Sequence, residues 1–573
     1  MADGLRGKLT NYGDPEFALF LRRAFLHSLG WDDEAFDRPI VGITNTYSDY
    51  NACHGTVPDL IEHVKRGVLS AGGIPMVFPT ITIQESFAYP TSMLLRNLMA
   101  MDTEEMIRAQ PMDSVVLVGG CDKTLPAQIM AAASANTPAI VLPVGPMATG
   151  RHRGRVLGAC TDCRSAWAEF RAGRIGEAEL RSVGARLAAT PGTCTVMGTA
   201  STIALIVEGM GLTLPMAATI PATHSERKRL AHATGVTAVR MAQSNSPRPR
   251  ELVTCDSLRN AQVLLQAIGG STNAVVHLTA IARRAGIEFD LRELDRIGHD
   301  VPVVVDVKPS GGGYMEDLHA AGGLLRVISA VQDRLNLDIP TVGGTTFREL
   351  LAECDLGFEH KAVRSEAKPL HSGGAIAVLT GNLAPRGALI KQSAASPHLL
   401  RHTGRAIVFD SIEDMIDRID RADLDAAPSD VLVMRNAGPK GAPGMPEAGA
   451  FPIPGKLSQM GVTDMVRISD SRMSGTAFGT VVLHVSPEAA DGGPLARLRS
   501  GDRIELDVPN RTLNVLVAAE EFAARDTCSH QTTRPPSRGY SRLFLDHVLQ
   551  ADLGCDFDFL QESVADDGPG NRS

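Results

Sequence analysis

Short apolar runs alternate with helical patterns in the first part of the chain. Four runs have the length and continuous apolar character of buried strands: residues 39–44, 74–78, 114–118 and 139–144. Helical patterns occupy residues 58–69 and 124–135 between them. Strand, helix and strand in this order form the βαβ unit of a parallel sheet. The pattern therefore predicts an N-terminal parallel-sheet α/β domain over residues 1–370.

The pattern changes after about residue 370, where short β-like runs with turn signals between them replace most helices. These runs are GGAIAVL, RAIVFD, DVLVMR, MVRIS, GTVVLHV, DRIELDV and TLNVLV. The last two together are typical of a β-hairpin. We predict a C-terminal β-rich, barrel-like domain with flanking helices over residues 371–573, with the boundary in the polar stretch 361–372. In the first domain, VPVVVDV (301–307) is one further candidate strand.

Composition and charge exclude several classes of protein. The 573 residues include 56 Lys and Arg against 65 Asp and Glu, a net charge of −9, and no basic block indicates a nucleic-acid partner. Apolar runs are far shorter than the ~20 residues that span a bilayer. The N-terminus lacks the apolar core of a secretory signal. We expect a cytoplasmic protein with no membrane or nucleic-acid partner.

The cysteines are the first candidates for chemistry. Nine of them, scattered through a long chain, argue against a disulfide framework. The segment GGCDK places Cys121 and Asp122 directly after a predicted strand, where parallel sheets bind ligands. This predicts a thiolate ligand for a soft iron centre beside a carboxylate ligand for a hard cation. Cys53 and Cys194 also lie at loop-to-helix junctions, although a cysteine in either place, taken alone, is more often a small buried residue than a ligand. Three thiolates together leave one position of a cluster open, as a catalytic iron requires.

A second cysteine pattern, the CxxC of Cys160 and Cys163, could indicate zinc or thiol-redox chemistry. It has no partner pair and no nearby histidine at zinc spacing. We therefore assign it a structural role, with a thiol-redox centre as the weaker alternative. His54, beside Cys53, is either a supporting or a solvent-facing residue, and we assign it no role.

Seven motifs run in order through both predicted domains. They are NACHG (51–55), GGCDKTLPAQ (119–128), GTCTVMGTAST (192–202), GGSTNAVVHL (269–278), GAPGMPE (441–447), SDSRMSGTAFGT (469–480) and HVSPEAADGGPLA (484–496). Together they resemble the IlvD/Edd family of dehydratases, which includes dihydroxy-acid, phosphogluconate and aldonate (sugar-acid) dehydratases. The resemblance covers nearly the whole chain.

The resemblance implies two sets of ligands and one base. Three residues would hold a [2Fe–2S] cluster with an open iron: Cys53, Cys121 and Cys194. Four would hold Mg²⁺: Glu85, Asp122, Lys123 and Glu447. Lys123 would be carbamylated by CO₂ and so become an anionic oxygen ligand. Ser474 matches the serine proposed as catalytic base.

These roles suit a hydro-lyase that dehydrates 2,3-dihydroxy carboxylic acids to 2-keto-3-deoxy acids. An open ferric site can act as a Lewis acid on the departing hydroxide, and Mg²⁺ can stabilise the enolate-like charge. A serine alkoxide becomes accessible next to a divalent cation.

The residues around Cys53 and Glu85 resemble the aldonate subgroup, so we predict sugar acids such as arabinonate or xylonate as substrates, with glycerate as a small one. Dihydroxy-acid dehydratase of branched-chain amino-acid synthesis is the alternative, and a non-catalytic iron–sulfur redox or sensor protein is a second one. The resemblance also implies a homodimer or homotetramer.

Overall fold

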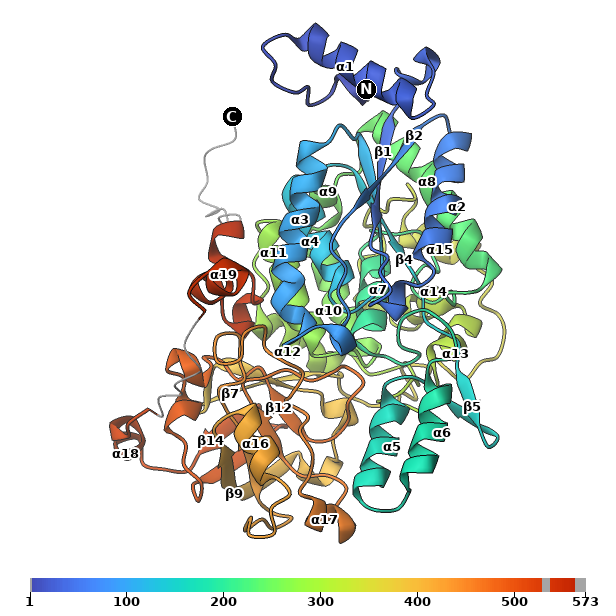
Figure 1. Cartoon of the computed structure of the whole chain (residues 1–573). Helices are drawn as coiled ribbons and strands as arrows, with labels where there is room; N and C mark the ends of the chain where they lie inside the picture. Colours follow the sequence, from blue (N-terminus) through green and yellow to red (C-terminus); the bar gives the residue numbers. More distant parts are fainter. Residues whose placement is uncertain (1–2, 528–535, 562–573) are drawn as a thin grey trace.

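Four parallel strands in the order β2-β1-β3-β4 form the sheet of the N-terminal half (Figure 1). They are β1 (Ile40–Asn45), β2 (Ile74–Pro79), β3 (Ser114–Gly119) and β4 (Ala139–Pro143). The computed structural model describes residues 3–527 and 536–561 and confirms the four predicted strands of this sheet. Helices cover both faces of the sheet: α2 (Val57–Ser70) and α8 (Ser225–Ser244) lie on one face, and α3 (Arg96–Ala109) and α4 (Thr124–Ala135) on the other. Because both faces are covered, β1, β3 and β4 are continuously apolar.

This half contains further helices, most of which pack around the sheet and its connections. They are α1 (Pro15–Ser28), α5 (Thr161–Arg171), α6 (Glu177–Leu187), α7 (Thr199–Gly209), α9 (Pro249–Leu252), α10 (Cys255–Ala267), α11 (Asn273–Arg284), α12 (Leu291–Asp300), α13 (Met315–Ala320), α14 (Gly323–Ala330) and α15 (Phe347–Glu353). The predicted strand over 301–307 is wrong, because only isolated bridges form there, such as Val303 with His371. Its apolar side chains are buried in an extended connection, and burial alone produces the same pattern.

Eight strands close into a barrel in the C-terminal half, in the order β10-β11-β12-β8-β7-β14-β13-β9. Their bounds are β7 (Ala377–Gly381), β8 (Ala384–Ile390), β9 (Arg401–Phe409), β10 (Val431–Met434), β11 (Arg467–Ser469), β12 (Val481–Leu483), β13 (Arg503–Asp507) and β14 (Thr512–Val515). This confirms the β-rich, barrel-like prediction, and β13 and β14 pair as the predicted antiparallel hairpin. Strand β8 was not predicted, because Pro385 and Gly387 interrupt its apolar pattern. Three short helices accompany the barrel: α16 (Ile412–Arg418), α17 (Gly455–Gln459) and α18 (Ala519–Ala524).

The end of the described chain returns to the N-terminal half. Helix α19 (Gly539–His547) lies beside that half rather than beyond the barrel (Figure 1). The Tyr540 hydroxyl donates to the Leu94 carbonyl at 2.7 Å, and the Arg96 guanidinium donates to the Cys555 carbonyl at 2.8 Å. The two halves are therefore joined by buried hydrogen bonds as well as by the loops of the site.

Two peripheral features extend from opposite ends of the molecule. Helices α5 and α6, with the hairpin β5 (Gly150–His152) and β6 (Arg155–Leu157), extend beside the barrel, while α1 lies at the far end of the sheet (Figure 1). Among the residues that the structure describes, no helix is both long and apolar enough to cross a membrane.

Candidate active site

Three carboxylates from separate segments converge at the carboxyl edge of the sheet. Glu85 follows β2, Asp122 follows β3, and Glu447 lies in the long loop after β10 of the barrel. One carboxylate oxygen of each lies within 4.8 Å of the others. Hard oxygen ligands at this spacing suit Mg²⁺. The structure therefore brings together three of the predicted magnesium ligands from both halves of the chain.

The fourth predicted ligand, Lys123, lies among these carboxylates and is fully buried. Its Nζ forms ion pairs with Asp122 and, at 3.2 Å, with Glu85 Oε2. Glu447 Oε1 lies 3.8 Å away. Burial lowers the pKa of Lys123, but the three carboxylates outweigh it and leave the pKa above its ordinary value. The Lys123 ammonium therefore neutralises the same three carboxylates that a bound metal cation would neutralise.

A second buried cation, Arg472, joins the two halves at this site. Its Nη1 donates to Glu447 Oε1 at 2.5 Å and its Nη2 to Glu85 Oε2 at 3.1 Å. Glu85 also accepts hydrogen bonds from Thr91 at 2.6 Å and Ser92 at 2.5 Å. Although burial alone would raise it, the pKa of Glu85 is lowered by Lys123, Arg472 and these hydroxyls, so the carboxylate stays ionised.

The three predicted cluster cysteines lie beside the carboxylates. Cys53 follows β1, Cys121 follows β3, and Cys194 precedes α7. A hydrogen bond to Cys53 and burial raise the pKa of the Cys121 thiol. The Cys121 thiol also donates to Asp122 Oδ1 at 3.5 Å. Soft sulfur donors next to hard oxygen donors are the combination that an iron centre beside a magnesium ion would require.

His54 holds the cysteine loop in place. Its Nδ1 lies 2.8 Å from the Thr46 carbonyl, which leaves Nε2 as an acceptor for the backbone N–H groups of Gly120 at 3.0 Å and Cys121 at 3.1 Å. Burial lowers the pKa of His54 to about 4, although the Thr46 bond opposes the shift, so the ring is neutral at pH 7. Sequence reasoning gave His54 no role, because its partners lie in another loop.

Ser474 lies in the loop after β11, half-buried, and its Oγ is 2.8 Å from Thr476 Oγ1. The loop packs closely against the N-terminus of α7. A Cβ on Gly475 would lie 2.6 Å from the Ser271 side chain and 2.9 Å from the Thr199 backbone nitrogen, so only glycine fits. The serine therefore lies at the junction of the barrel with the helix that follows Cys194.

Sequence reasoning missed Arg472 and Cys160. Arg472 lies in the SDSRMSG segment already singled out, two residues before Ser474, and an arginine there was the available signal. Cys160 belongs to the CxxC assigned a structural role, yet its Sγ lies 2.7 Å from Cys194 Sγ. The sequence offered no signal for this contact, because CxxC spacing usually points to ligands within the motif.

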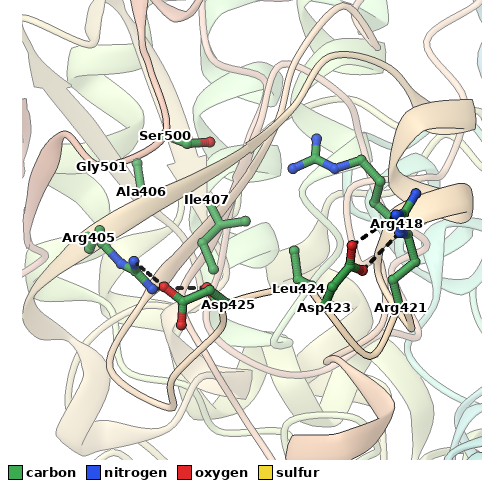
Figure 2. A pocket seen from close by; sticks show the side chains of 10 residues that line it. All are labelled: Arg405, Ala406, Ile407, Arg418, Arg421, Asp423, Leu424, Asp425, Ser500 and Gly501. Atoms are coloured by element: carbon green, nitrogen blue, oxygen red, sulfur yellow. Dashed lines mark hydrogen bonds and ion pairs between the residues drawn. The ribbon is translucent and has the colours of Figure 1, made fainter.

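A surface hollow of about 510 Å³ lies on the barrel, away from these residues (Figure 2). Three arginines and two aspartates line much of it, and Arg405 pairs with Asp425 as Arg421 does with Asp423. Because these arginines are already paired with aspartates at an open surface, they are not free to bind a substrate carboxylate in the hollow. The converging carboxylates and thiols, rather than this hollow, form the candidate active site.

Known proteins match this chain over nearly its whole length. Residues 38–350 match the family described as Dihydroxy-acid/6-phosphogluconate dehydratase N-terminal, and residues 361–555 match its C-terminal counterpart. The L-arabonate dehydratase of Azospirillum brasilense is 46% identical over 551 residues, 94% of each chain. The 6-deoxy-6-sulfo-D-gluconate dehydratase of Pseudomonas putida is 43% identical over 550 residues, 95% of each. The dihydroxy-acid dehydratase of Halothermothrix orenii is 36% identical over 541 residues, 93% of this chain and 97% of that one.

Proposed function

The chain belongs to the dihydroxy-acid/6-phosphogluconate dehydratase family, and we propose that this dehydratase removes water from sugar acids with the help of a [2Fe–2S] cluster and Mg²⁺. Arabinonate, xylonate and the smaller glycerate are the proposed substrates, and 2-keto-3-deoxy acids the products. Greater identity to relatives named for sugar acids than to one named for dihydroxy acids supports this choice. Branched-chain dihydroxy acids are the alternative substrates.

The convergence of hard and soft donors from both halves of the chain carries the proposal. Asp122, Glu85 and Glu447 would hold Mg²⁺, with Lys123 as a fourth ligand after carbamylation by CO₂. Carbamylation replaces the ammonium by an anionic oxygen donor, so the incoming Mg²⁺ would take over the charge compensation that Lys123 now supplies. Arg472 would remain as a fixed cation that spaces Glu85 and Glu447.

The thiolates of Cys53, Cys121 and Cys194 would hold the cluster, and His54 would fix the backbone that carries Cys121. When bound, the cluster supplies a Lewis acid for the departing hydroxide, and Mg²⁺ holds the substrate carboxylate and stabilises enolate-like charge. Cys53 and Cys121 are buried and Cys194 is partly buried, which limits the access of bulk water to these ligands.

Ser474 would act as the base. As an alkoxide, its Oγ would accept the proton from C2 of the acid as hydroxide leaves C3. Transfer of that proton from Oγ to the hydroxide would then release water and restore the alkoxide. The contact with Thr476 Oγ1 orients this oxygen, since the threonine hydroxyl can donate to the alkoxide and leave its other lone pairs toward the substrate. The serine would face its substrate from the barrel, opposite the thiols of the other half.

The test uses anaerobically prepared protein, with iron and sulfide counts and a visible absorption spectrum. We expect turnover of arabinonate or xylonate above that of 2,3-dihydroxyisovalerate. Ser474→Ala should keep the cluster absorbance and lose turnover by several orders of magnitude, while Ser458→Ala, in α17, should leave both unchanged. A strong preference for dihydroxyisovalerate would favour the branched-chain alternative. A cluster without turnover of any of these acids would favour the redox or sensor protein.

A homodimer or homotetramer in the cytoplasm is the proposed assembly and location. Helix α1 presents several exposed apolar side chains, among them Phe20 at 64% and Phe25 at 69% exposure. Adjacent exposed apolar side chains of this kind mark protein contact surfaces. This observation supports a contact between copies through α1.

A further inference from the structure

An unpaired cation lies next to the loop of the proposed base. Arg164, in α5, is half-buried, and its Nε lies 3.5 Å from Thr476 Oγ1. Among the residues that the structure describes, no carboxylate forms an ion pair with this guanidinium, and its terminal nitrogens Nη1 and Nη2 have no hydrogen-bond acceptor. A guanidinium carries most of its N–H donors on these two nitrogens. Those donors are therefore available to a ligand.

Neighbouring arginines in α5 and in the turn after it differ from Arg164. Arg171, about two turns further along the helix, donates to Asp420 at 2.7 and 2.5 Å. Arg174 pairs with Glu169 at 2.5 Å. A carboxylate of the chain compensates each of these two charges, whereas the charge of Arg164 has no such partner.

Contacts from both halves of the molecule hold the start of α5 in place. Thr161 donates from Oγ1 to the Thr476 carbonyl in the barrel loop at 3.0 Å. Asp162 accepts from Lys308 Nζ in the N-terminal half at 2.8 Å. Arg164 follows Thr161 by one turn of the same helix and therefore approaches the barrel loop from a fixed direction.

The order of side chains along the barrel loop shows on which side of the base Arg164 lies. Arg472 contacts the carboxylates of the candidate magnesium site. Ser474 comes next, and then Thr476, whose hydroxyl contacts both Ser474 Oγ, at 2.8 Å, and Arg164. Ser474 therefore separates the carboxylates from Arg164 along this loop. An acid held by its carboxylate at the magnesium site, with C2 at Ser474, would extend its other end toward Arg164.

That other end distinguishes the candidate substrates. In a pentonate such as arabinonate, C4 and C5 carry hydroxyl groups, whose oxygens can accept hydrogen bonds from a guanidinium. 2,3-Dihydroxyisovalerate has only methyl groups beyond C3, so the guanidinium would lose water without gaining an acceptor. Glycerate ends at C3 and leaves this space to water. A charged donor at this place therefore favours acids with a hydroxylated tail.

We propose that Arg164 is a substrate-binding residue, which donates from its terminal nitrogens to the C4 and C5 hydroxyls of a sugar acid. It thereby selects sugar acids over branched-chain dihydroxy acids. The inference rests on the proposed function and adds the residue that contacts the part of the substrate remote from the reacting carbons.

The test compares Arg164→Met with the wild type on glycerate and on arabinonate or xylonate, whichever the wild type turns over faster. Methionine keeps an unbranched apolar side chain and removes every donor, so the variant should fold. We expect kcat/KM for the pentonate to fall about 10- to 100-fold, as for lost hydrogen bonds to a charged group. For glycerate, which has no C4 or C5, kcat/KM should not change. Arg164→Lys keeps the charge without the planar fork and should recover part of the loss.

Binding gives a readout that does not depend on turnover. In Ser474→Ala protein, calorimetry with the pentonate should give a Kd that rises about 10- to 100-fold when Arg164→Met is added. The Kd of glycerate should stay the same. Arg174→Met, whose arginine pairs with Glu169 beyond the same helix, is the control and should match the wild type in the turnover assay.

The failures of this inference and of the proposed function are distinguishable. An equal loss with the pentonate and with glycerate would overturn the role of Arg164 in binding the tail, because the residue would then act on the base through Thr476. Unchanged values with both acids would overturn that role as well. Wild-type protein that turns over none of these acids with its cluster intact would overturn the proposed function, and the calorimetric comparison would still decide whether Arg164 binds the hydroxylated tail.

Discussion

Arg472 donates to Glu85 across 387 positions of sequence, with 3.1 Å between Nη2 and Oε2. The bond joins a barrel loop to a loop of the parallel sheet, and both groups belong to the candidate magnesium site. A buried ion pair of this kind gains little over an apolar pair, yet the loss of one partner leaves the other charged and uncompensated. The partly buried Glu85 carboxylate therefore needs a neighbouring cation to compensate its charge, whether or not a metal ion is bound.

Replacement of Arg472 tests this dependence. In metal-free protein, Arg472→Met should lower the free energy of unfolding by about 3–5 kcal/mol, because two carboxylates lose their shared partner. Mg²⁺ should raise the melting temperature of the variant more than that of the wild type, since it restores the missing charge. Arg181→Met, at an exposed arginine that pairs with the exposed Glu177, is the control and should change neither value appreciably. Equal Mg²⁺ shifts in both proteins would contradict a magnesium site between Glu85 and Glu447.

His54 supports the Cys121 loop, so its removal should affect the cluster before the fold. His54→Ala leaves two buried N–H groups unsatisfied, at a cost of about 1–3 kcal/mol each. We expect iron and sulfide content to fall well below the wild-type value while the far-ultraviolet circular dichroism stays the same. His224→Ala, at an exposed histidine, should retain full content. Full iron and sulfide content in His54→Ala would show that the loop is held by other contacts.

The buried Lys391 leads us to expect that the free energy of unfolding depends on pH. It is fully buried, and its Nζ donates to the Gly475 carbonyl at 3.4 Å. Burial lowers its pKa from 10.5 to about 7. Between these values the unfolded chain binds a proton that the folded protein lacks, so this lysine makes stability rise with pH, by at most about 1.4 kcal/mol per pH unit.

Lys391→Met should therefore stabilise the protein most at pH 7, and the gain should shrink toward pH 10. Urea unfolding at several pH values measures the difference between variant and wild type, which isolates this group from other titrations. Lys65→Met, at a partly exposed lysine that pairs with Glu62, is the control and should show no such trend. A constant gain across this range would mean that Lys391 keeps its ordinary pKa.

Local patterns in the sequence predicted much of the fold, and residues that are neighbours in sequence predicted part of the site. Continuous apolar runs identified β1, β3 and β4, and residues Cys121 and Asp122 stood out because they are neighbours in sequence after a strand. Contacts between distant segments were not predictable in the same way. His54 lies 66 positions before the Gly120 N–H that it accepts, and nothing in NACHG indicates which loop it supports. The same holds for Cys160, whose sulfur partner lies outside its own motif.

Helix α1 predicts how copies of the chain associate. Asp14 caps it by accepting from the Glu16 and Phe17 backbone N–H groups, so it is a well-formed helix despite its peripheral place (Figure 1). Phe20 and Phe25 remain largely exposed, and the cost of hydrating them is relieved if a second copy covers them. Light scattering should give a wild-type mass of two or four times 60.9 kDa.

The double variant Phe20→Glu and Phe25→Glu should shift that mass toward 60.9 kDa, because the covered face would then have to bury two carboxylates. Phe358→Glu changes an exposed phenylalanine elsewhere and should keep the wild-type mass. A double variant with the wild-type mass would place the contact on another surface. A wild-type protein that is monomeric at micromolar concentration would contradict the proposed assembly. It would mean that Phe20 and Phe25 stay exposed to water.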